Sequence, residues 1–571
     1  MLRLLEGQSD EHQVPFEKLL EAEGARASQF DPRCGVRQVE LMAELHRAAQ
    51  ARFFGSGVPP LAAIAPRVLL GPNSKVVDHL VSGVGLLTLV ASVRESAGEA
   101  ALLKAINDGP GNGELVWNVA STPLEFVAGV IRWGTVRGKE KCRIRATDEV
   151  RAWVAETLLA AGVDTKPRLG GVSAVGTQLS QVLGAIPTMM ALGSLSPDIL
   201  QYLDPKTAVV GTSEQTKTLG ELPRAKSAIP NLSIQHRGAP LELPLSQCTV
   251  AQTASCHQTI GEIDIIATGN GEVPFEGLSV ERSRRLGQVH DIMVLTGAHR
   301  LRAAEDTESF FEHVAAIREG GTAIALIQAD PRHADNAPRI LQKIRDQKVI
   351  DYWGMNGSEA FHILTLVAES SALRRTLAPE CFDRLTKALA SAAEPTTIWP
   401  SSRETPRWIA ESALLLQEIF DVPLVRVRGR AVDLLAVSPR LRDEDLSRVR
   451  DHLIISRNLA TLKVAELDGL LDDPKDLLPL RNLPDGGYVA AVRGVQDVWE
   501  ARFPSSRHGS FAELQLSECG IARSETGQAL IAVSPIQFYD RTGGTQSAGD
   551  TIDVSFVAME AHGLMAAALK K

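Results

Sequence analysis

Short apolar runs alternate along the chain with stretches in which apolar residues recur at helical spacing. The apolar runs, each followed by turn-forming residues, predict buried strands at 62–83, 187–195, 291–301, 321–330, 349–356 and 422–439. Helical spacing occupies 308–320 and 337–348 between them. Because strands that alternate with helices favour βαβ units, the pattern predicts an α/β protein with a parallel, doubly wound sheet.

Two regions depart from this alternation. Residues 1–62 carry apolar side chains at helical spacing among charged ones, which predicts an N-terminal helical extension. Residues 205–290 are rich in Thr, Ser, Pro and Gly, and 259–269 alternates between apolar and polar positions. This composition predicts an antiparallel β insertion or lid rather than further βαβ units.

Composition narrows the classes of function. The chain has 571 residues, of which 44% are hydrophobic, and 60 Lys and Arg against 69 Asp and Glu give a formal net charge of -9. This balance provides no global attraction to nucleic acid or to an anionic membrane. No apolar run approaches the roughly 20 residues that cross a bilayer, and the first residues do not resemble a signal peptide. We therefore expect a cytoplasmic protein without a nucleic-acid or membrane partner.

Signatures of other cofactors are weak. The six cysteines are scattered without a CxxC pair, which argues against a zinc ribbon and against a secreted disulfide framework. Cys248, Cys256 and His257 lie close together in the sequence but have no fourth ligand nearby. The glycine clusters lack the GK(S/T) of a P-loop, and no convincing GxGxxG supports a nicotinamide-dependent enzyme.

The most informative motif lies near the C-terminus, where residues 539–571 place a glycine-rich turn, an aspartate and an apolar helix in succession. Backbone N–H groups and the dipole at the start of such a helix can hold an anion and stabilise a transferring phosphoryl group. The amides of Ala548, Gly549 and Asp550 would hold the phosphoryl oxygens, and the Asp550 carboxylate would take the proton from an attacking hydroxyl. The alternative is that Asp550 is only the N-cap of the last helix.

The segment SAGDTID, residues 547–553, resembles the GxGDT(I/A)S block of the ADP-dependent glucokinase/phosphofructokinase family, in the ribokinase-like superfamily. Further segments resemble blocks of that family and occur in the family's order: 70–83, 109–114, 168–176, 291–301 and 354–360. The co-linear blocks span residues 65–571, so the resemblance covers most of the chain.

The resemblance implies a fold and a reaction. The fold would be a ribokinase-like three-layer α/β/α domain over 63–571, with a mostly parallel sheet and a smaller β-rich lid from segments near 81–165 and 205–285. The reaction would transfer the β-phosphoryl group of Mg-ADP to a hydroxyl of a hexose or hexose phosphate and release AMP. Mg²⁺ would be the cofactor, and the setting would be carbohydrate metabolism such as glycolysis.

Four residues carry the acceptor side of the resemblance. Asp78 corresponds to the family's sugar-binding aspartate, and Gly170 and Gly171 match the start of a Gly-Gly-Asn block whose backbone approaches the sugar closely. Arg285 stands at the arginine that contacts the sugar phosphate in the phosphofructokinase branch. The alternatives are a turn or N-cap role for Asp78 and a solvated surface position for Arg285.

On the donor side, the family's NxxE pattern is intact as Asn356 and Glu359. The resemblance implies that Asn356, Ala548 and Gly549 contact the nucleotide and that Glu359 and Asp550 support Mg²⁺. The alternative for Asn356 and Glu359 is a capping box, in which an N-cap residue and an acidic residue three positions later bond each other's backbone N–H groups.

Three departures from the family pattern stand out. Val172 replaces the Asn of the Gly-Gly-Asn block, so sugar selectivity should differ from that of the family. Ile327 replaces a Glu that is linked to the metal. The family's His-x-His-Thr nucleotide block aligns with RVRGR, residues 426–430, which supplies Arg426 and Arg428. Arginine pairs bidentately with phosphate, and the alternative is an ordinary charged strand end.

These departures leave two other functions open. One is a ribokinase-like kinase with another donor or acceptor, and the other is a non-catalytic homologue that binds sugar or nucleotide. The basic stretch 137–149 favours a phosphorylated acceptor, although Glu140 aligns only loosely with a lid glutamate of the glucokinase branch. The motifs do not indicate an oligomeric state.

Overall fold

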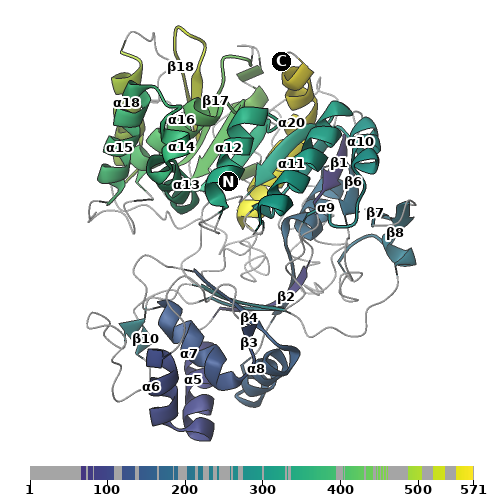
Figure 1. The fold of residues 1–571 in the computed structure, drawn as a ribbon, viewed down its shortest axis with the longest axis vertical. Coiled ribbons are helices and arrows are strands. Elements are labelled where there is room, and N and C mark those ends of the chain that lie inside the picture. Colours follow the sequence, from purple (N-terminus) through teal and green to yellow (C-terminus); the bar gives the residue numbers. More distant parts are fainter. Residues whose placement is uncertain are drawn as a thin grey trace, which may run out of the picture.

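The structure is a computed structural model, and Figure 1 shows its fold. It describes residues 66–71, 75–81, 83–108, 119–134, 141–163, 166–183, 185–190, 202–211, 216–222, 231–235, 241–242, 257–258, 262–267, 274–298, 301, 303–327, 331, 336–393, 403, 405–429, 432–441, 445–446, 448–450, 452–453, 456–457, 460, 487–504, 519–533 and 548–569. The helical extension predicted over 1–62 lies outside the described residues.

One large sheet organises the upper part of the molecule in Figure 1. Among the described residues its eleven strands, in sheet order, are β18 (Cys519–Arg523), β19 (Ala529–Val533), β17 (Asp433–Val437), β16 (Leu424–Arg428), β15 (Tyr352–Asn356), β14 (Ala323–Ile327), β13 (Ile292–Leu295), β1 (Arg67–Leu70), β6 (Ile186–Met190), β7 (Ala208–Val210) and β8 (Thr216–Thr218). Neighbouring strands are parallel from β16 to β7, and β17–β19 and β8 pair antiparallel at the two edges. The mostly parallel sheet is therefore confirmed.

The central strands show why the sequence pattern was informative. β13 and β14 are buried at every position, and β15 and β16 are buried at all positions except the last. Strands of a parallel sheet are covered on both faces, so they appear in the sequence as continuous apolar runs. The strands predicted at 291–301, 321–330 and 349–356 contain β13, β14 and β15, and the run 422–439 contains the antiparallel pair β16 and β17.

Helices cover both faces of this sheet. One layer contains α10 (Val280–Val289), α11 (Ala304–Glu319), α12 (Ala337–Gln347), α13 (Gly357–Glu369), α14 (Ser371–Arg374), α15 (Pro379–Ala393), α16 (Pro406–Phe420) and α18 (Gly487–Arg502). The other layer contains α9 (Val172–Val182) and α20 (Ala548–Leu569). Each layer buries its own apolar cluster against the sheet. The arrangement confirms the predicted three-layer α/β/α fold.

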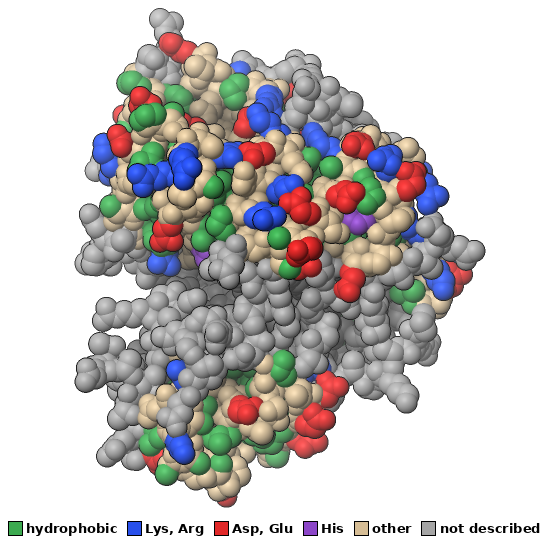
Figure 2. Space-filling model, viewed as in Figure 1, with side chains coloured by type: hydrophobic (Ala, Val, Ile, Leu, Met, Phe, Trp, Pro, Cys, Tyr) green, Lys and Arg blue, Asp and Glu red, His purple; other side chains and the backbone are tan. Residues whose placement is uncertain are grey.

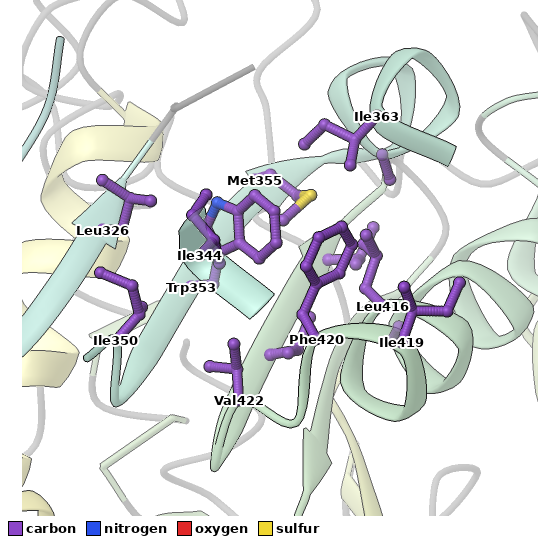
Figure 3. Packing of buried hydrophobic residues seen from close by; sticks show 14 of the residues in the cluster. Leu326, Ile344, Ile350, Trp353, Met355, Ile363, Leu416, Ile419, Phe420 and Val422 are labelled. Atoms are coloured by element: carbon purple, nitrogen blue, oxygen red, sulfur yellow. The ribbon is translucent and has the colours of Figure 1, made fainter. Parts of the chain in front are cut away.

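A tight aromatic contact anchors the first helical layer to β15. Trp353 of β15 and Phe420 at the end of α16 are fully buried, and their rings meet edge to face with centroids 5.1 Å apart. Figure 3 shows Leu326, Met355 and Ile363 around this pair. Aromatic pairs of this kind add about 0.5–1.5 kcal/mol beyond the burial of their surface. The packing therefore holds in place the strand that ends at the candidate site.

Among the described residues a second sheet of six strands forms a smaller domain at the lower end of Figure 1. In sheet order they are β3 (Val119–Ala120), β4 (Lys141–Ala146), β12 (Glu262–Ala267), β9 (Asn231–Gln235), β2 (Lys75–Val81) and β5 (Lys166–Gly170). On the side away from the large domain lie α5 (Gly83–Ala97), α6 (Glu99–Asp108), α7 (Pro123–Gly134) and α8 (Asp148–Ala160), with a third apolar cluster.

The smaller domain agrees with the predicted lid in part of its strand pairing. β9 and β12 pair antiparallel, as the composition of 205–290 predicted. A separate antiparallel ribbon joins β10 (Leu241–Glu242) to β11 (His257–Gln258). The sheet is nevertheless mixed, because β2 pairs parallel with β9 and β4 pairs parallel with β12. Strands from separate lengths of chain thus interleave, which local alternation along one segment could not indicate.

The described surface mixes charges of both signs. Figure 2 shows Lys and Arg side chains interspersed with Asp and Glu over the described part of the large domain. On α11 and α12, for example, Glu308 lies 2.5 Å from Lys343 and 3.5 Å from Arg339. Within the part of the chain that the structure describes, no helix has the length and apolarity needed to span a membrane.

Candidate active site

The candidate site lies where the carboxyl ends of two central strands meet the start of α20. Asn356 ends β15 and Arg428 ends β16, and the two residues are direct register partners in this parallel pair. Gly549, the second residue of α20, lies against Arg428, since a Cβ added to Gly549 would stand 2.3 Å from Arg428 Nη1. Open parallel α/β sheets bind their ligands outside the carboxyl ends of the strands.

The motif predicted as an anion hole forms the first turn of α20. The helix begins at Ala548, so Ala548, Gly549 and Asp550 are its first three residues. Backbone N–H groups in the first turn have no partner within a helix, and the helix dipole adds positive potential at this end. Asp550 is therefore inside the first turn. The N-cap alternative required it to precede that turn.

Alternation along the strands explains how polar side chains reach the face that α20 covers. Side chains two residues apart in a strand point to the same side of the sheet. Tyr352 and Gly354 share one face of β15, and Arg426 and Arg428 share the same face of β16. Asp433 of the antiparallel neighbour β17 is the register partner of Arg428. Polar or glycine residues at every second position of these apolar strands therefore bring the site together on one face of the sheet.

Arg428 is held by a carboxylate of α20. Its Nη1 lies 3.1 Å from Oδ2 of Asp553, whose side chain is fully buried. Tyr352 donates its hydroxyl hydrogen to Oδ1 of Asp553 over 2.6 Å, and Nε of Arg428 donates to the carbonyl oxygen of Met355 over 3.3 Å. Gly354 makes room for the carboxylate, because a Cβ there would stand 2.7 Å from Asp553 Oδ1. Contacts thus run from β15 through α20 to the end of β16.

Arg426 has a different environment from Arg428, although only two residues separate them. The Arg426 side chain is fully buried and donates through Nε and Nη2 to the two carboxylate oxygens of Asp433, over 3.0 and 2.5 Å. Its Nη1 donates to the Ser456 hydroxyl over 3.3 Å and to the carbonyl oxygen of Ile552 over 3.4 Å. Neither sequence interpretation describes Arg426, because its hydrogen bonds go to the protein and its position is not a charged strand end.

Burial and charge act in opposite directions in this cluster. Burial raises the pKa of Asp553 above its ordinary value, although Arg428 and Arg426 oppose the shift. Burial and the charge of Asp553 raise the pKa of the Tyr352 hydroxyl well above its usual range, so Tyr352 stays a neutral donor. Burial alone would lower the pKa of Arg428, but Asp553 and Glu359 outweigh it and the pKa is raised. Arg428 is therefore a permanent cation at the start of α20.

Asn356 and Glu359 form the capping box that the sequence offered as an alternative. Asn356 is the N-cap of α13, and its Oδ1 accepts the backbone N–H of Glu359 over 2.8 Å. Glu359 Oε2 accepts the backbone N–H of Asn356 over 2.9 Å. The Asn356 side chain is exposed and Glu359 is half-buried, beside Arg428. The capping box therefore holds both polar groups at the start of α13, next to the end of β15.

Two acidic residues stand in the first turns of helices near this edge, Glu359 in α13 and Asp550 in α20. Among the described residues, no group of three or more His, Cys, Asp or Glu side chains is placed to hold a metal ion. Mg²⁺ in phosphoryl-transfer sites usually keeps several waters and takes one or two carboxylates besides the phosphates. Glu359 in the first turn of α13 and Asp550 in the first turn of α20 provide that number of acidic residues. The assignment of Mg²⁺ to Glu359 and Asp550 stays a prediction.

The predicted sugar-binding residues of the smaller domain come together along the backbone. Asp78 lies in β2 and pairs opposite Pro167 of β5, and Gly170 is the last residue of β5. Gly171 follows with a φ of 84°, a left-handed conformation that favours glycine, and α9 begins after it. Because α9 packs against α20, the turn that the sequence assigned to the sugar leads into the helix beside the anion hole.

Val172 and Ile327, two of the departures from the family pattern, are core residues. Val172 is the first residue of α9 and is 1% exposed, and Ile327 ends β14 and is fully buried. Both belong to the apolar cluster between the large sheet and the layer of α9 and α20. Because valine and isoleucine side chains are apolar, neither can make a hydrogen bond or bind a metal at these positions.

Arg285 lies apart from this edge of the sheet. It is exposed on α10, and α10 packs against α11 in the layer on the opposite face of the sheet from α20. The structure therefore separates Arg285 from Arg428 and Gly549 by the thickness of the sheet.

Sequence reasoning missed Asp553 and Tyr352. Asp553 stands in the apolar stretch TIDVSFVAM at 551–559, which is buried throughout. A carboxylate within such a helix must be paired, because an isolated buried charge is very costly. That argument could have indicated a buried cationic partner for Asp553, although it could not have selected Arg428 from the other arginines.

Comparison with known proteins supports the fold. No protein-family model matches the sequence, and no curated protein matches it. An ADP-dependent kinase solved with fructose 6-phosphate and ADPβS is similar in structure, with 13% identity, 91% of this chain and 98% of that chain covered, and a TM-score of 0.57. A phosphofructokinase from Pyrococcus horikoshii OT3 solved with AMP gives 12% identity, 89% and 99% coverage, and a TM-score of 0.55.

A third similar structure is the last common ancestor of ADP-dependent phosphofructokinases from Methanosarcinales, with 14% identity, 96% and 98% coverage, and a TM-score of 0.53. Because the identities are this low, the likeness establishes the fold. This chain therefore has the three-layer α/β/α fold of these proteins, over nearly their full length. The fold that the motifs implied is confirmed.

Proposed function

We propose that this protein is a phosphotransferase that moves the β-phosphoryl group of ADP to a hydroxyl of a hexose or hexose phosphate and releases AMP. The proposal is supported by the fold, which is similar to that of an ADP-dependent kinase solved with fructose 6-phosphate and ADPβS. One observation carries it: the first turn of α20 lies against Arg428 at Gly549, and Arg428 is the register partner of Asn356 at the carboxyl edge of the parallel sheet. Backbone amides at the start of a helix and a cation thus lie together at one edge.

In the proposed reaction Asp550 is the general base. Its carboxylate accepts the proton of the acceptor hydroxyl while that oxygen attacks the β-phosphorus of ADP. The bond between the β-phosphorus and the bridging oxygen breaks, and AMP leaves with the electron pair. The amides of Ala548, Gly549 and Asp550 stabilise the charge on the transferring group, as preorganised donors do in phosphoryl transfer. Asn356 contacts the nucleotide from the end of β15.

Mg²⁺ is the proposed cofactor, held by Glu359 and Asp550. When bound together with the nucleotide, it neutralises charge on the phosphate oxygens. The chain's contribution is orientation, because the amide hydrogen bond from Asn356 fixes the Glu359 carboxylate at the start of α13.

The acceptor side of the proposal rests on the smaller domain. Asp78 would accept hydrogen bonds from sugar hydroxyls, and the backbone at Gly170 and Gly171 would approach the sugar closely. Closure of the smaller domain over the site would exclude water and suppress hydrolysis of ADP. We place this activity in the carbohydrate metabolism of the cytoplasm.

A nucleotide-release assay tests the proposal. Purified protein is incubated with Mg²⁺, a panel of free and phosphorylated hexoses, and ADP, ATP or GTP in turn, while AMP and ADP are quantified. Asp550→Asn removes the base, and Asp497→Asn, at an exposed position of α18, is the matched control. We expect AMP from ADP with one class of sugar, lost in Asp550→Asn and retained in Asp497→Asn.

Other results would assign the alternatives. ADP formed from ATP, without AMP from ADP, would identify a kinase with another donor. Binding of nucleotide or sugar without turnover would identify a non-catalytic homologue, for which the buried Ile327 in place of a metal-linked acid is the motivating observation.

A further inference from the structure

Arg428 has few hydrogen bonds for a nearly buried cation. Its side chain is only 11% exposed. Nε donates a hydrogen bond of 3.3 Å to the Met355 carbonyl oxygen. Nη1 lies 3.1 Å from Asp553 Oδ2, but both of these buried atoms lack a hydrogen bond of acceptable geometry in the described structure. A buried donor on a charged group is costly to leave unsatisfied, so this position favours an additional acceptor.

Arg426 provides the internal reference. It is on the same strand and the same face, and it makes four hydrogen bonds, to both Asp433 oxygens, Ser456 and Ile552. The surroundings of Arg426 are complete, whereas those of Arg428 are not.

The place that Arg428 occupies is electrostatically unfavourable on its own. The start of a helix carries positive potential and favours anions, so a guanidinium against the first turn of α20 repels the helix dipole. The contact exists because position 549 is glycine: an added Cβ would stand 2.3 Å from Nη1, 3.0 Å from Cζ and 3.2 Å from Nη2. An anion between the guanidinium and the amides of the first turn would relieve both the repulsion and the unmade hydrogen bonds.

Asp553 and two glycines hold the guanidinium at this point. Asp553 is fixed by the Tyr352 hydroxyl at 2.6 Å and fits against β15 because Gly354 has no side chain. Gly354 therefore makes room for the acid that holds the cation, and Gly549 makes room for the cation itself. Two independent close approaches thus converge on one orientation of Arg428.

We infer that Arg428 binds the β-phosphoryl group of a nucleoside diphosphate together with the amides of Ala548, Gly549 and Asp550, and that Asp553 is the positioning residue for Arg428. This inference rests on the proposed function, because it assigns the donor phosphate to the same site. The guanidinium offers its planar N–H donors to the phosphoryl oxygens, which a lysine cannot match in geometry. The donor site would therefore distinguish ADP from AMP through a fixed protein cation.

Equilibrium binding of ADP and AMP tests this inference. Titration calorimetry on the full chain, with Mg²⁺ and again with a chelator, is performed for wild type, Arg428→Gln, Arg428→Lys and Asp553→Asn. Arg339→Gln, at a half-exposed position of α12, is the matched control. Thermal unfolding of each variant confirms that it is folded.

We expect Arg428→Gln to weaken ADP binding by about 10- to 100-fold, the usual loss for a hydrogen bond to a charged group, with AMP binding within about twofold of wild type. Arg428→Lys should lose less, because it keeps the charge without the planar donors. Asp553→Asn should reduce discrimination between ADP and AMP in the same direction, and Arg339→Gln should not change it.

Gly549→Ala provides a second route if Arg428→Gln does not fold. The added methyl group displaces the guanidinium while the charge stays in the protein, so ADP binding should weaken and AMP binding should not.

Three results would overturn the inference. Equal losses of ADP and AMP affinity in Arg428→Gln would indicate a structural role. Unchanged ADP binding in a variant that still turns ADP into AMP would reject the role of Arg428 and leave the proposed function standing. Absence of ADP binding and of turnover in the wild type would reject the proposed function together with the inference.

Discussion

Helix α20 carries two buried carboxylates, Asp553 and Glu560, whose surroundings differ. The two residues are seven positions apart, about two helical turns, so they lie on the same side of the helix. Glu560 accepts from His452 Nδ1 over 2.6 Å and lies 3.2 Å from Arg448 Nη2. Burial alone would raise the pKa of Glu560, but His452 and Arg448 outweigh it and the pKa is lowered. For Asp553 burial prevails and the pKa is raised.

The difference separates a structural part of the helix from a functional one. At Glu560 the two partners His452 and Arg448 offset the cost of burying a charge, and the carboxylate is satisfied by groups of the protein. At Asp553 the cationic partner Arg428 also lies against the first turn of α20, and its Nη1 makes no hydrogen bond within the described residues. Perturbed and incompletely satisfied groups are typical of binding and catalytic sites, because stability is sacrificed there for function.

Loss of the base at the functional end should have the largest effect. Asp550→Asn is expected to reduce turnover by about 10²–10⁴-fold, the usual contribution of general acid–base catalysis, because the amide cannot accept the hydroxyl proton. Thermal unfolding should stay near that of wild type. Initial rates of AMP formation for Asp550→Asn and the control Asp497→Asn check this. Similar rates in both variants would contradict the assignment of Asp550.

Loss of the acid at the structural end should reduce stability instead of activity. Glu560→Gln removes the buried carboxylate that pairs with His452 and Arg448, and losing a hydrogen bond to a charged group costs about 1.5–3 kcal/mol of unfolding free energy. Urea unfolding measures the loss, with Glu312→Gln at an exposed position of α11 as the matched control. ADP affinity under native conditions should be unchanged. An ADP-specific binding defect would show that the two ends of α20 are not separate in function.

Crowding of the Asp553 carboxylate should reduce both stability and ADP binding. Gly354→Ala places a methyl group 2.7 Å from Asp553 Oδ1, and overpacking of this kind costs about 1–3 kcal/mol. Because Asp553 positions Arg428, ADP binding should also weaken more than AMP binding. Gly494→Ala in α18 is the control, since its added methyl group meets neighbours only at 3.4 Å. A stability loss with unchanged ADP binding would separate Asp553 from the donor site.

The contributions of the two carboxylates to the free energy of unfolding should change in opposite directions with pH. This effect should be the smallest of the series. The pKa of Glu560 is lowered from 4.5, so its stabilisation is complete above pH 4.5 and is lost as the pH falls through the folded value. The pKa of Asp553 is raised from 3.8, so its ionisation costs stability as the pH rises from 3.8 through the folded value.

Urea unfolding between acid and neutral pH checks these signs. The advantage of wild type over Glu560→Gln should shrink toward low pH, and the stability of Asp553→Asn relative to wild type should increase as the pH rises. Relative to wild type, Glu560→Gln should therefore lose stability and Asp553→Asn should gain it as the pH rises, and a change of the same sign in both variants would contradict the comparison.

The fold was largely predictable because its main signals are local. The buried strands β13 and β14 are continuous apolar runs, and a parallel sheet covered on both faces produces such runs. The start of α20 at Ala548 was also visible, since a glycine-rich turn precedes an apolar helix. The mixed pairing of the smaller sheet was not, because β4 and β12 are neighbours in space but lie more than a hundred residues apart in the sequence.

For the candidate site, the helix start that carries the glycine-rich motif could be predicted from the sequence, and the pairing of its charges could not. Two arginines in RVRGR look alike in sequence, and their roles differ because Arg426 finds Asp433 on the next strand whereas Arg428 finds Asp553 on the last helix. These partners depend on which strand and helix cover the face of β16. Residue types and spacing carry no information about that covering, so the distinction required the structure.

The central claim is that the protein transfers a phosphoryl group from ADP to a sugar at the first turn of α20. Phosphorus NMR of wild-type protein with Mg-ADP and the hexose panel follows the β-phosphoryl group directly. The account predicts equal growth of AMP and of one new phosphate ester of the sugar, both absent with Asp550→Asn. Growth of AMP with inorganic phosphate in place of the ester, or the same ester with Asp550→Asn, would contradict it.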